Sequence, residues 1–479
     1  MELFSDRPGD EGLPGRERRL AMAAVMTTTT MAVFDGSMVN IALPQIARAL
    51  DVSSSDAIWV ANGYLLSVAM TLAIFAALAT RFGFRALFAI GLGVFTLASL
   101  GCAMSSSLEM LIAMRLLQGI GGAATLSIGP AILRSIFPNR LLGRILGLNA
   151  LLVAASTAIA PILGGTLLSA MSWQWLFAIN IPLGIIALTL TLRVIPGKSS
   201  PAREPFDIAG AVLSAVMLGS LIMTARTFSQ PDDGALSFDT LTTAVAFGLT
   251  AVITGLAFIW RQRHAPKPLL PLGMFASMRF SLAALTSMAS FVSQGITFVA
   301  LPFLFQSVYG YSAFMSALLF TPWPIGIILA APYAGRLADR YPSAIISTVG
   351  LCLFAVGLAL LALLPDHAQV WDIGVRSLLC GIGFGCFQSP NNREMLSNAS
   401  RENSGYASGV LAIMRTFGQC LGAAFVGVIL AAYVQSGGEP PQLAVQEAQA
   451  VRLSLWLAAA ATILAIAISF SRIRSRREK

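Results

Sequence analysis

Long apolar segments follow one another along almost the whole chain, and this pattern limits the possible folds more than any other feature. We count about fourteen segments of roughly 20 predominantly apolar residues, the length that an α-helix needs to cross a bilayer. They lie near residues 20–43, 58–79, 86–105, 109–133, 145–169, 174–195, 207–226, 241–260, 281–304, 313–334, 344–364, 372–391, 405–433 and 452–470. Inside hydrocarbon a segment must hydrogen-bond its own backbone, so each is predicted to be a helix.

The composition excludes the class of soluble globular proteins. Hydrophobic residues make up 56% of the chain and charged residues only 11%, whereas about a quarter of the residues in a soluble domain are charged. No stretch is long and polar enough to form a separate soluble domain. Residues 1–19 mix acids with bases and lack an apolar core, so they are not predicted to be a cleavable signal peptide.

Basic residues are distributed unevenly across the loops. Most of the 31 Lys and Arg residues fall in the tails and in the loops on the N-terminal side of the segments, and only Arg48, Arg226 and Arg452 fall on the other side. This is the positive-inside pattern, and it predicts that both termini are cytoplasmic. The net charge of +9 is therefore attributed to orientation in a membrane, and no nucleic-acid partner is expected.

The order of the segments predicts two similar halves. We expect a cytoplasmic tail at 1–19, a six-helix half at 20–195, a linker with two additional transmembrane helices at 196–279, a second six-helix half at 280–470 and a basic cytoplasmic tail at 471–479. Short turns containing Gly and Arg follow the second helix of each half, at 78–85 and at 335–341. Repeated halves of this kind are typical of secondary transporters.

Asp35 is the only acidic residue between Arg19 and Asp51, and it lies inside the first apolar segment. A carboxylate within hydrocarbon costs at least ~2.5 kcal/mol, so an acid in this position is a candidate functional residue. Burial also favours the protonated form of a carboxylate, which suits a group that exchanges protons. The structural alternative is a carboxylate that hydrogen-bonds the backbone where Gly36 loosens the helix.

An ordered series of motifs runs along the chain. Its members are Asp35–Pro44 (DGSMVNIALP), Trp59 with Val60 and Tyr64, Arg115–Gly122 (RLLQGIGG), Ala160–Gly165 (APILGG), Trp173–Gly184 and Phe387–Asn392 (FQSPNN). The series resembles the motifs of the drug:proton antiporter-2 family, the 14-spanning branch of the major facilitator superfamily, over nearly the whole length. The resemblance implies an all-α polytopic membrane protein with the major facilitator fold, in which two extra central helices join two six-helix halves.

The resemblance also implies roles for individual residues. Those implied in proton coupling or substrate binding are Asp35, Asn40, Asn62, Tyr64, Arg115 and Gln118. Those implied in gating or conformational change are Arg81, Gly83, Arg85, Pro161, Gly164, Gly165, Gly335, Asp339, Arg340 and Arg415. Physical alternatives stay open, because Arg115 could be a structural ion-pair partner and Arg376, near a segment end, could extend toward the interface. Arg415 has no evident acid on its own segment.

Three positions depart from the family pattern. Thr80 stands where an acid usually precedes Arg81, which puts a charge network at the first turn in doubt, whereas the second turn keeps Asp339 and Arg340. Ala160 replaces a glycine before Pro161. Asn62 stands where exporters of quaternary ammonium compounds often carry an acid, so a second fixed negative charge for a dication is missing.

These observations predict a proton-coupled secondary transporter that exports lipophilic, cationic compounds by alternating access. It is expected in the cytoplasmic (inner) membrane of a bacterium as a multi-pass monomer whose partners are a small-molecule substrate, protons and the lipid bilayer. Asp35 is expected to bind the proton and the substrate in turn. The alternative within transport is a carrier for an endogenous metabolite or a siderophore.

Motifs for other chemistry are absent from the sequence. Gly197-Lys198-Ser199 resembles the end of a phosphate-binding loop, but Leu192 occupies the position of the required first glycine. Neither HExxH nor GxSxG occurs. We therefore expect no enzyme activity, no cofactor and no metal, although a membrane-embedded enzyme or sensor is the alternative of a different class.

Overall fold

The computed structural model describes residues 12–138, 141–197, 206–229, 238–266, 268–366, 368–398, 404–434 and 440–474. Residues 1–11 of the predicted N-terminal tail, 198–205 and 230–237 of the predicted linker, and 475–479 of the predicted C-terminal tail lie outside these ranges. Within the described ranges every regular element is helical.

The helices follow the predicted apolar segments closely. The α-helices are α1 (Gly15–Ala49), α2 (Ser54–Phe82), α3 (Phe84–Ala103), α4 (Leu108–Ile136), α5 (Leu142–Ala170), α6 (Trp175–Ala178), α7 (Asn180–Val194), α8 (Ile208–Thr227), α9 (Phe238–His264), α10 (Met278–Phe303), α11 (Ala313–Phe320), α12 (Pro322–Leu337), α13 (Ser343–Ala362), α14 (Val370–Ser397), α15 (Ser404–Tyr433) and α16 (Pro440–Arg474). A 3-10 helix, η4 (Leu272–Ala276), precedes α10. A π-helix, η5 (Leu304–Val308), continues α10 and begins two residues after Pro302.

Thirteen helical stretches of the described residues are long and apolar enough to cross a membrane, and each coincides with a predicted segment. The remaining predicted segment, 20–43, forms part of α1. It is more polar than the others because it carries Asp35 and the threonine run 27–30. The all-helical membrane fold is therefore confirmed, while the fourteenth crossing stays a prediction.

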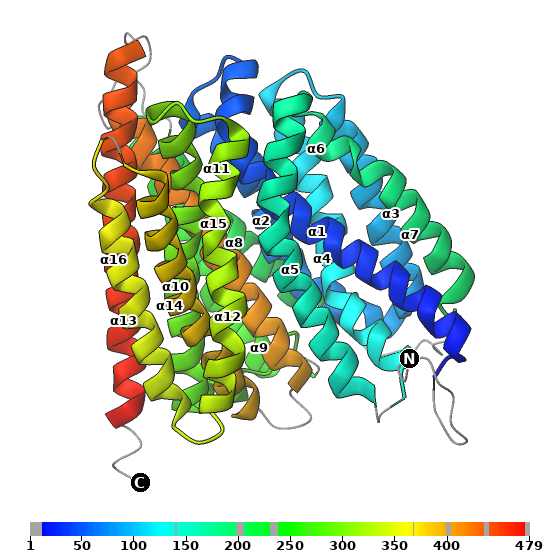
Figure 1. Cartoon of the computed structure of the whole chain (residues 1–479). Coiled ribbons are helices and arrows are strands. Elements are labelled where there is room, and N and C mark those ends of the chain that lie inside the picture. The colour runs from blue at the N-terminus through cyan, green and yellow to red at the C-terminus, as the bar shows by residue number, and fades with distance from the viewer. Residues whose placement is uncertain are drawn as a thin grey trace.

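Figure 1 shows the early helices, in blue to teal, on one side of the molecule and the later helices, in green to red, on the other. On the first side α4 packs between α2 and α3, and α1 packs against α5 and α7; on the second, α14 packs against α12 and α13, and α10 against α15 and α16. The two sides meet where α2 contacts α15 and where α5 contacts α11. Helix α1 begins, and α16 ends, at the same end of the bundle.

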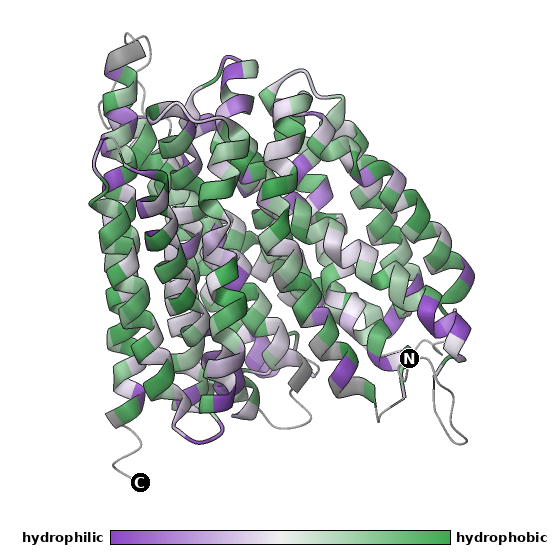
Figure 2. Ribbon diagram, viewed as in Figure 1, coloured by the Kyte–Doolittle hydropathy of each residue, from purple (hydrophilic) through white to green (hydrophobic). Residues whose placement is uncertain are grey.

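The surface of the bundle has the polarity that a membrane requires. Figure 2 shows hydrophobic residues along the middle of the helices and hydrophilic residues gathered toward their ends. On α9, Val252, Ile253 and Leu256 are 59%, 63% and 64% exposed. Large aliphatic side chains this exposed are stable when lipid rather than water covers them.

The pair α8–α9 is anchored through Asp207. The Asp207 carboxylate caps α8 by accepting a hydrogen bond from the Gly210 N–H at 3.0 Å, and it also accepts bonds from Arg261 Nε and Gln262 Nε2 at 2.9 Å each. Burial raises the pKa of Asp207. The hydrogen bonds and the Arg261 charge lower this pKa by more than burial raises it, so the net shift is downward. Its contribution to stability is therefore present above the pKa of an unfolded aspartate and is lost as the pH falls through the lower, folded-state pKa.

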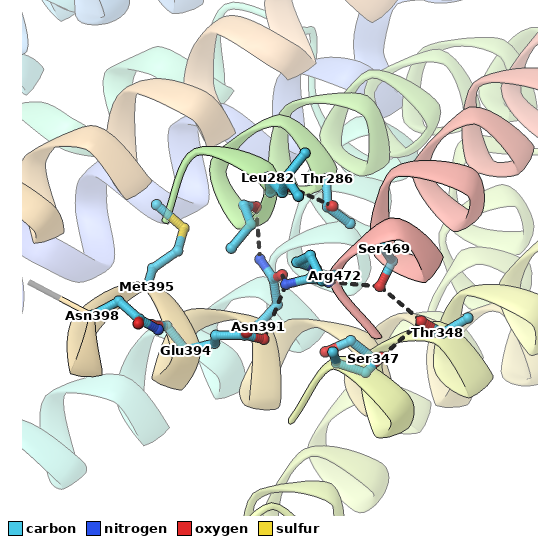
Figure 3. Close-up of polar contacts among 12 residues, drawn as sticks. Leu282, Thr286, Ser347, Thr348, Asn391, Glu394, Met395, Asn398, Ser469 and Arg472 are labelled. Atoms are coloured by element: carbon cyan, nitrogen blue, oxygen red, sulfur yellow. Dashed lines mark hydrogen bonds and ion pairs between the residues drawn. The ribbon is translucent and has the colours of Figure 1, made fainter. Parts of the chain in front are cut away.

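A second polar cluster joins four helices at the end of α16 (Figure 3). Arg472 is 2% exposed and donates to Asn391 Oδ1 at 2.8 Å, to Glu394 Oε2 at 3.1 Å and to Ser469 Oγ at 2.6 Å. Ser469 in turn bonds Thr348 on α13, and Asn391 donates to the Ala283 carbonyl on α10. The sequence predicts a basic tail at 471–479. In the structure α16 continues to Arg474, and the Arg472 side chain is buried.

Replacement of Arg472 by Gln should lower the thermal unfolding midpoint of the detergent-purified protein. Removing one partner of a buried ion pair typically costs about 3–5 kcal/mol, and Glu394 at 12% side-chain exposure places this pair toward the lower end. The matched control is Arg393→Gln, which breaks the exposed pair with Asp339, where both side chains face solvent. Equal midpoints for the two variants would show that the Arg472 cluster does not hold these helices together.

Candidate functional site

The centre of the site is a buried ion pair between α1 and α4. Arg115 Nη1 lies against Asp35 Oδ2 in direct contact, and both residues are 1% exposed. The Arg115 Nε also donates to the Val60 carbonyl of α2 at 2.9 Å. A carboxylate and a guanidinium can be buried together only when each compensates the other and the remaining donors are satisfied, which is the case here.

Two amides and a hydroxyl complete this arrangement. Gln118 Nε2 donates to Asp35 Oδ1 at 2.8 Å and to Ser99 Oγ at 2.9 Å, and its Oε1 accepts from Arg115 Nη1 at 2.7 Å. Asn180 Nδ2, at the start of α7, donates to the same Asp35 oxygen at 3.2 Å. We refer to Asp35, Arg115, Gln118, Asn180 and Ser99 as the Asp35 network; it links α1, α3, α4 and α7.

The sequence identified Asp35, Arg115 and Gln118, and the structure brings them together. It did not identify Asn180 or Ser99 as their partners. Asn180 was noted only as part of a motif, and the available signal was an uncharged amide at the start of an otherwise apolar helix. Nothing distinguishes Ser99 from the other hydroxyl residues of the chain.

Tyr64 separates the Asp35 network from an internal cavity. The Arg115 guanidinium carbon lies 4.6 Å from the Tyr64 ring centroid and 5.5 Å from that of Phe177, so both aromatic rings contact the cation. Gly119 allows this approach, because a Cβ at that position would lie 2.5 Å from the Tyr64 carbonyl oxygen. Tyr64 also lines the cavity.

The cavity has a volume of about 760 Å³ and is enclosed by helices of both sides of the bundle. Its walls come from α1, α2, α4, α5, α10 and α15. The lining reaches Arg81, Arg134, Asp207 and Tyr406 at the helix ends on the side where α1 begins and α16 ends. The cavity is large enough for a drug-sized molecule. Its polar wall residues include Asn40, Tyr64, Gln294, Arg415 and Gln419.

Asp35 does not line this cavity, contrary to the expectation that substrate and proton meet at its carboxylate. The residues of α1 that do are Ala32, Val33, Gly36, Ser37 and Asn40. At about 100° per residue these positions form one face of the helix, and Asp35 points away from it into the Asp35 network. Helical periodicity could have shown that Asp35 and Asn40 lie on different faces.

Arg415 lies on the opposite wall, one helical turn from Gln419 on α15. Gln419 Nε2 donates to Gln294 Oε1 of α10 at 2.9 Å. Among the residues that the structure describes, Arg415 makes no hydrogen bond or ion pair. Arg376, in contrast, donates to Asp372 Oδ1 one turn away at 2.8 Å.

Asn62 lies outside the cavity as well. It is fully buried between α2 and α15. With its amide oriented to satisfy both neighbours, its nitrogen lies 3.1 Å from the Cys420 carbonyl oxygen and its oxygen 3.2 Å from the Ala424 N–H. Asn62 therefore joins the two sides of the bundle and does not reach a molecule in the cavity.

Apart from Arg415, the residues predicted to act in conformational change fall at two ends of the bundle. At the cavity mouth, Arg81 lies over the Phe82 ring and Gly83 adopts φ +87°, where glycine is favoured. Arg85 donates to the Leu192 carbonyl. In the corresponding turn of the later helices, Asp339 pairs with Arg393, Arg340 is exposed and Gly335 faces Ser389.

At the other end the α5 motif closes against the later helices. A Cβ on Gly165 would lie 2.8 Å from the Ala313 carbonyl oxygen of α11, and one on Gly164 would lie 3.1 Å from Met38 of α1. Pro161 lies one turn earlier within α5. These glycines permit close helix contacts, the role that small residues commonly play in membrane bundles.

In the described part of the chain, no group of three His, Cys, Asp or Glu side chains is placed to hold a metal ion.

Comparisons with known proteins agree with this architecture. The family model of the Major Facilitator Superfamily matches residues 25–423. The chain is 40% identical over 470 residues to the uncharacterized transporter YebQ of Escherichia coli (strain K12), covering 98% of each protein. It is 31% identical over 426 residues to the tetracenomycin C resistance and export protein of Streptomyces glaucescens, covering 88% of this chain and 78% of that protein.

A solved structure shares the fold at low sequence identity. It is a bacterial homolog of the human lysosomal transporter Spinster, crystallised in an inward-facing and unoccupied conformation. The two align with a TM-score of 0.69 and 15% sequence identity over 98% of each chain. The likeness concerns the fold alone.

The separation of the Asp35 network from the cavity can be tested by cysteine accessibility. Ser37→Cys, on the cavity wall, should react readily with N-ethylmaleimide in the purified protein. Ser99→Cys, at a site with 0% exposure inside the Asp35 network, should be protected. Both substitutions would be made in a variant in which Cys352 and Cys386 are replaced by Ser, because these are the native cysteines that are not buried. Similar labelling rates at positions 37 and 99 would show that Tyr64 does not form a wall.

Proposed function

The chain belongs to the Major Facilitator Superfamily, and on that basis we propose that it is a proton-coupled secondary transporter that exports lipophilic small molecules by alternating access. The observation that carries the proposal is the Asp35–Arg115 pair, buried directly behind one wall of a cavity of substrate size. A charged pair within a membrane bundle has its best-supported use in ion pathways and proton relays.

Export is the direction that the relatives and the sequence motifs favour. One relative is named as a resistance and export protein for tetracenomycin C. The motifs at Asp35–Pro44 and Ala160–Gly165 resemble those of the 14-spanning drug:proton antiporter-2 family. In this proposal α1 is the fourteenth crossing, and the pair α8–α9 is the insertion that joins two six-helix halves.

The distribution of basic residues supports a proposed orientation in the membrane. We place the protein in a bacterial cytoplasmic membrane with both termini in the cytoplasm, and the cavity then opens to the cytoplasm. Contacts between the two halves close the opposite end: Gln306 Nε2 donates to the Ile41 carbonyl at 2.7 Å, and Ser54 Oγ donates to Glu447 Oε1 at 2.6 Å. Alternating access requires these contacts to break while the cavity mouth closes.

Coupling in this arrangement is conformational. When Asp35 takes up a proton, the ion pair loses one of its charges, and Arg115 keeps only its bonds to Gln118 and to the Val60 carbonyl. Tyr64 contacts the guanidinium on one side and lines the cavity on the other. A change in the position of Arg115 therefore shifts the Tyr64 ring, and this ring contacts a substrate bound in the cavity.

This arrangement no longer supports the expectation that the substrate is a cation. A cation was expected because Asp35 was thought to contact the substrate directly, whereas the carboxylate lies behind Tyr64. We therefore retain export of lipophilic compounds and derive the charge of the substrate from the cavity itself.

The function can be tested in inverted membrane vesicles. A growth-inhibition panel in a pump-deficient host that overproduces the protein, beginning with tetracenomycin C, would first select a compound. Inverted vesicles should accumulate that compound only when their interior is acidic, and an uncoupler should abolish the accumulation. Accumulation without a gradient would contradict the proposal.

Arg115→Lys tests the coupling element in the same assay. Lysine keeps the charge but lacks the planar fork that bonds Asp35, Gln118 and the Val60 carbonyl together. Gradient-driven uptake should fall roughly tenfold or more, because each hydrogen bond to a charged group is worth about 1.5–3 kcal/mol. The control Arg263→Gln removes an exposed charge outside the cavity and should transport normally at equal protein level. Normal uptake by Arg115→Lys would remove Arg115 from the mechanism.

A further inference from the structure

Arg415 is an arginine within a membrane helix that faces the cavity and has no partner among the described residues. It lies near the middle of α15 and lines the cavity wall. Arg415 is half-buried, whereas the fully buried Arg115 and Arg472 have carboxylate and amide partners. No hydrogen bond, ion pair or ring contact joins Arg415 to any described residue.

An unpaired guanidinium at this depth is costly. Charged residues inside a bundle are usually paired with one another or directed to a ligand pathway. No carboxylate of the described residues pairs with Arg415, so an anionic group that enters the cavity would compensate its charge. The neighbouring Gln419–Gln294 pair adds amide groups on the same wall.

Apart from Asp207, the charged side chains of the described cavity lining are positive. Arg81 and Arg134 lie toward the mouth, and Arg415 lies deeper. Asp207 is the acid of this lining, and its carboxylate is occupied by Arg261, Gln262 and the Gly210 N–H. A cavity lined by one sign of charge with low-dielectric walls concentrates ligands of the opposite sign.

We propose that the exported substrate is an organic anion, a lipophilic acid whose carboxylate binds the Arg415 guanidinium. Arginine suits this ligand because its donors match a carboxylate in bidentate geometry. The apolar body of the substrate has Val68, Leu72, Phe298 and Ile413 available on the cavity walls. This inference rests on the proposed export function and identifies the substrate class of the same cavity.

The charge of the substrate determines how transport responds to membrane voltage. Exchange of one entering proton for one leaving monoanion moves two positive charges inward, whereas exchange for a monocation moves none. Export of an organic anion is therefore accelerated by an inside-negative potential. Each charge contributes about 2.3 kcal/mol per 100 mV.

Three aromatic probes with the same body distinguish the substrate classes: naphthalene-2-carboxylate, naphthalene-2-carboxamide and trimethyl(2-naphthyl)ammonium. Binding to the purified full-length protein would be measured by titration calorimetry at pH 7.5. The parent protein should bind the carboxylate about tenfold to a hundredfold more tightly than the amide or the ammonium, because the guanidinium bonds only the anion with charge assistance. Arg415→Gln should abolish this preference, Arg415→Lys should retain part of it, and Arg263→Gln should leave it unchanged.

The inference is overturned if the carboxylate binds no better than the other two probes, or if Arg415→Gln keeps the preference. Correct folding of Arg415→Gln would be judged by an unfolding midpoint equal to that of Arg263→Gln. A failure of the export proposal would look different. The binding preference for the carboxylate would persist, but uptake into inverted vesicles would occur without a proton gradient.

Discussion

The burial of two opposite charges between α1 and α4 is the interaction on which the rest of the structure depends. Neither Asp35 nor Arg115 could remain inside the bundle alone, because an isolated buried charge costs several kcal/mol. Together they form a stable unit only because Gln118, Asn180 and the Val60 carbonyl satisfy the remaining donors and acceptors. Helices α2 and α7 must therefore pack where they do, and glycines such as Gly119 permit the approach.

In the proposed mechanism, this requirement separates the proton site from the substrate site. The Asp35 network lies on the far side of Tyr64 from the cavity, so a proton and a substrate can bind to the same protein without sharing a carboxylate. The coupling between them has to pass through the position of the Arg115 guanidinium and the ring beside it. The cavity is then free to carry its own charge, which Arg415 makes positive.

Much of this could be predicted from the sequence. Apolar segments of sufficient length predicted the helices, and the isolated Asp35 together with the motif at Arg115–Gln118 predicted the centre of the site. The partners Asn180 and Ser99 could not be predicted, because hydrogen bonds between helices depend on how the helices pack and not on local pattern. The burial of Arg472 could not be predicted either, because a basic residue at a helix end is usually solvated, whereas Glu394 and Asn391 of α14 lie opposite this one.

The most direct test of the central claim is the number of protons that the purified protein releases on binding a transported compound in weak buffer, at a pH where the compound is fully ionised. The parent protein should release protons, whereas Asp35→Asn, which has nearly the same volume but cannot ionise, should bind the compound and release none. Asp35→Glu keeps the carboxyl group but displaces it by about one methylene, so it should release protons with a shifted pH profile. Release by Asp35→Asn equal to that of the parent would contradict the claim that Asp35 is the site of proton exchange.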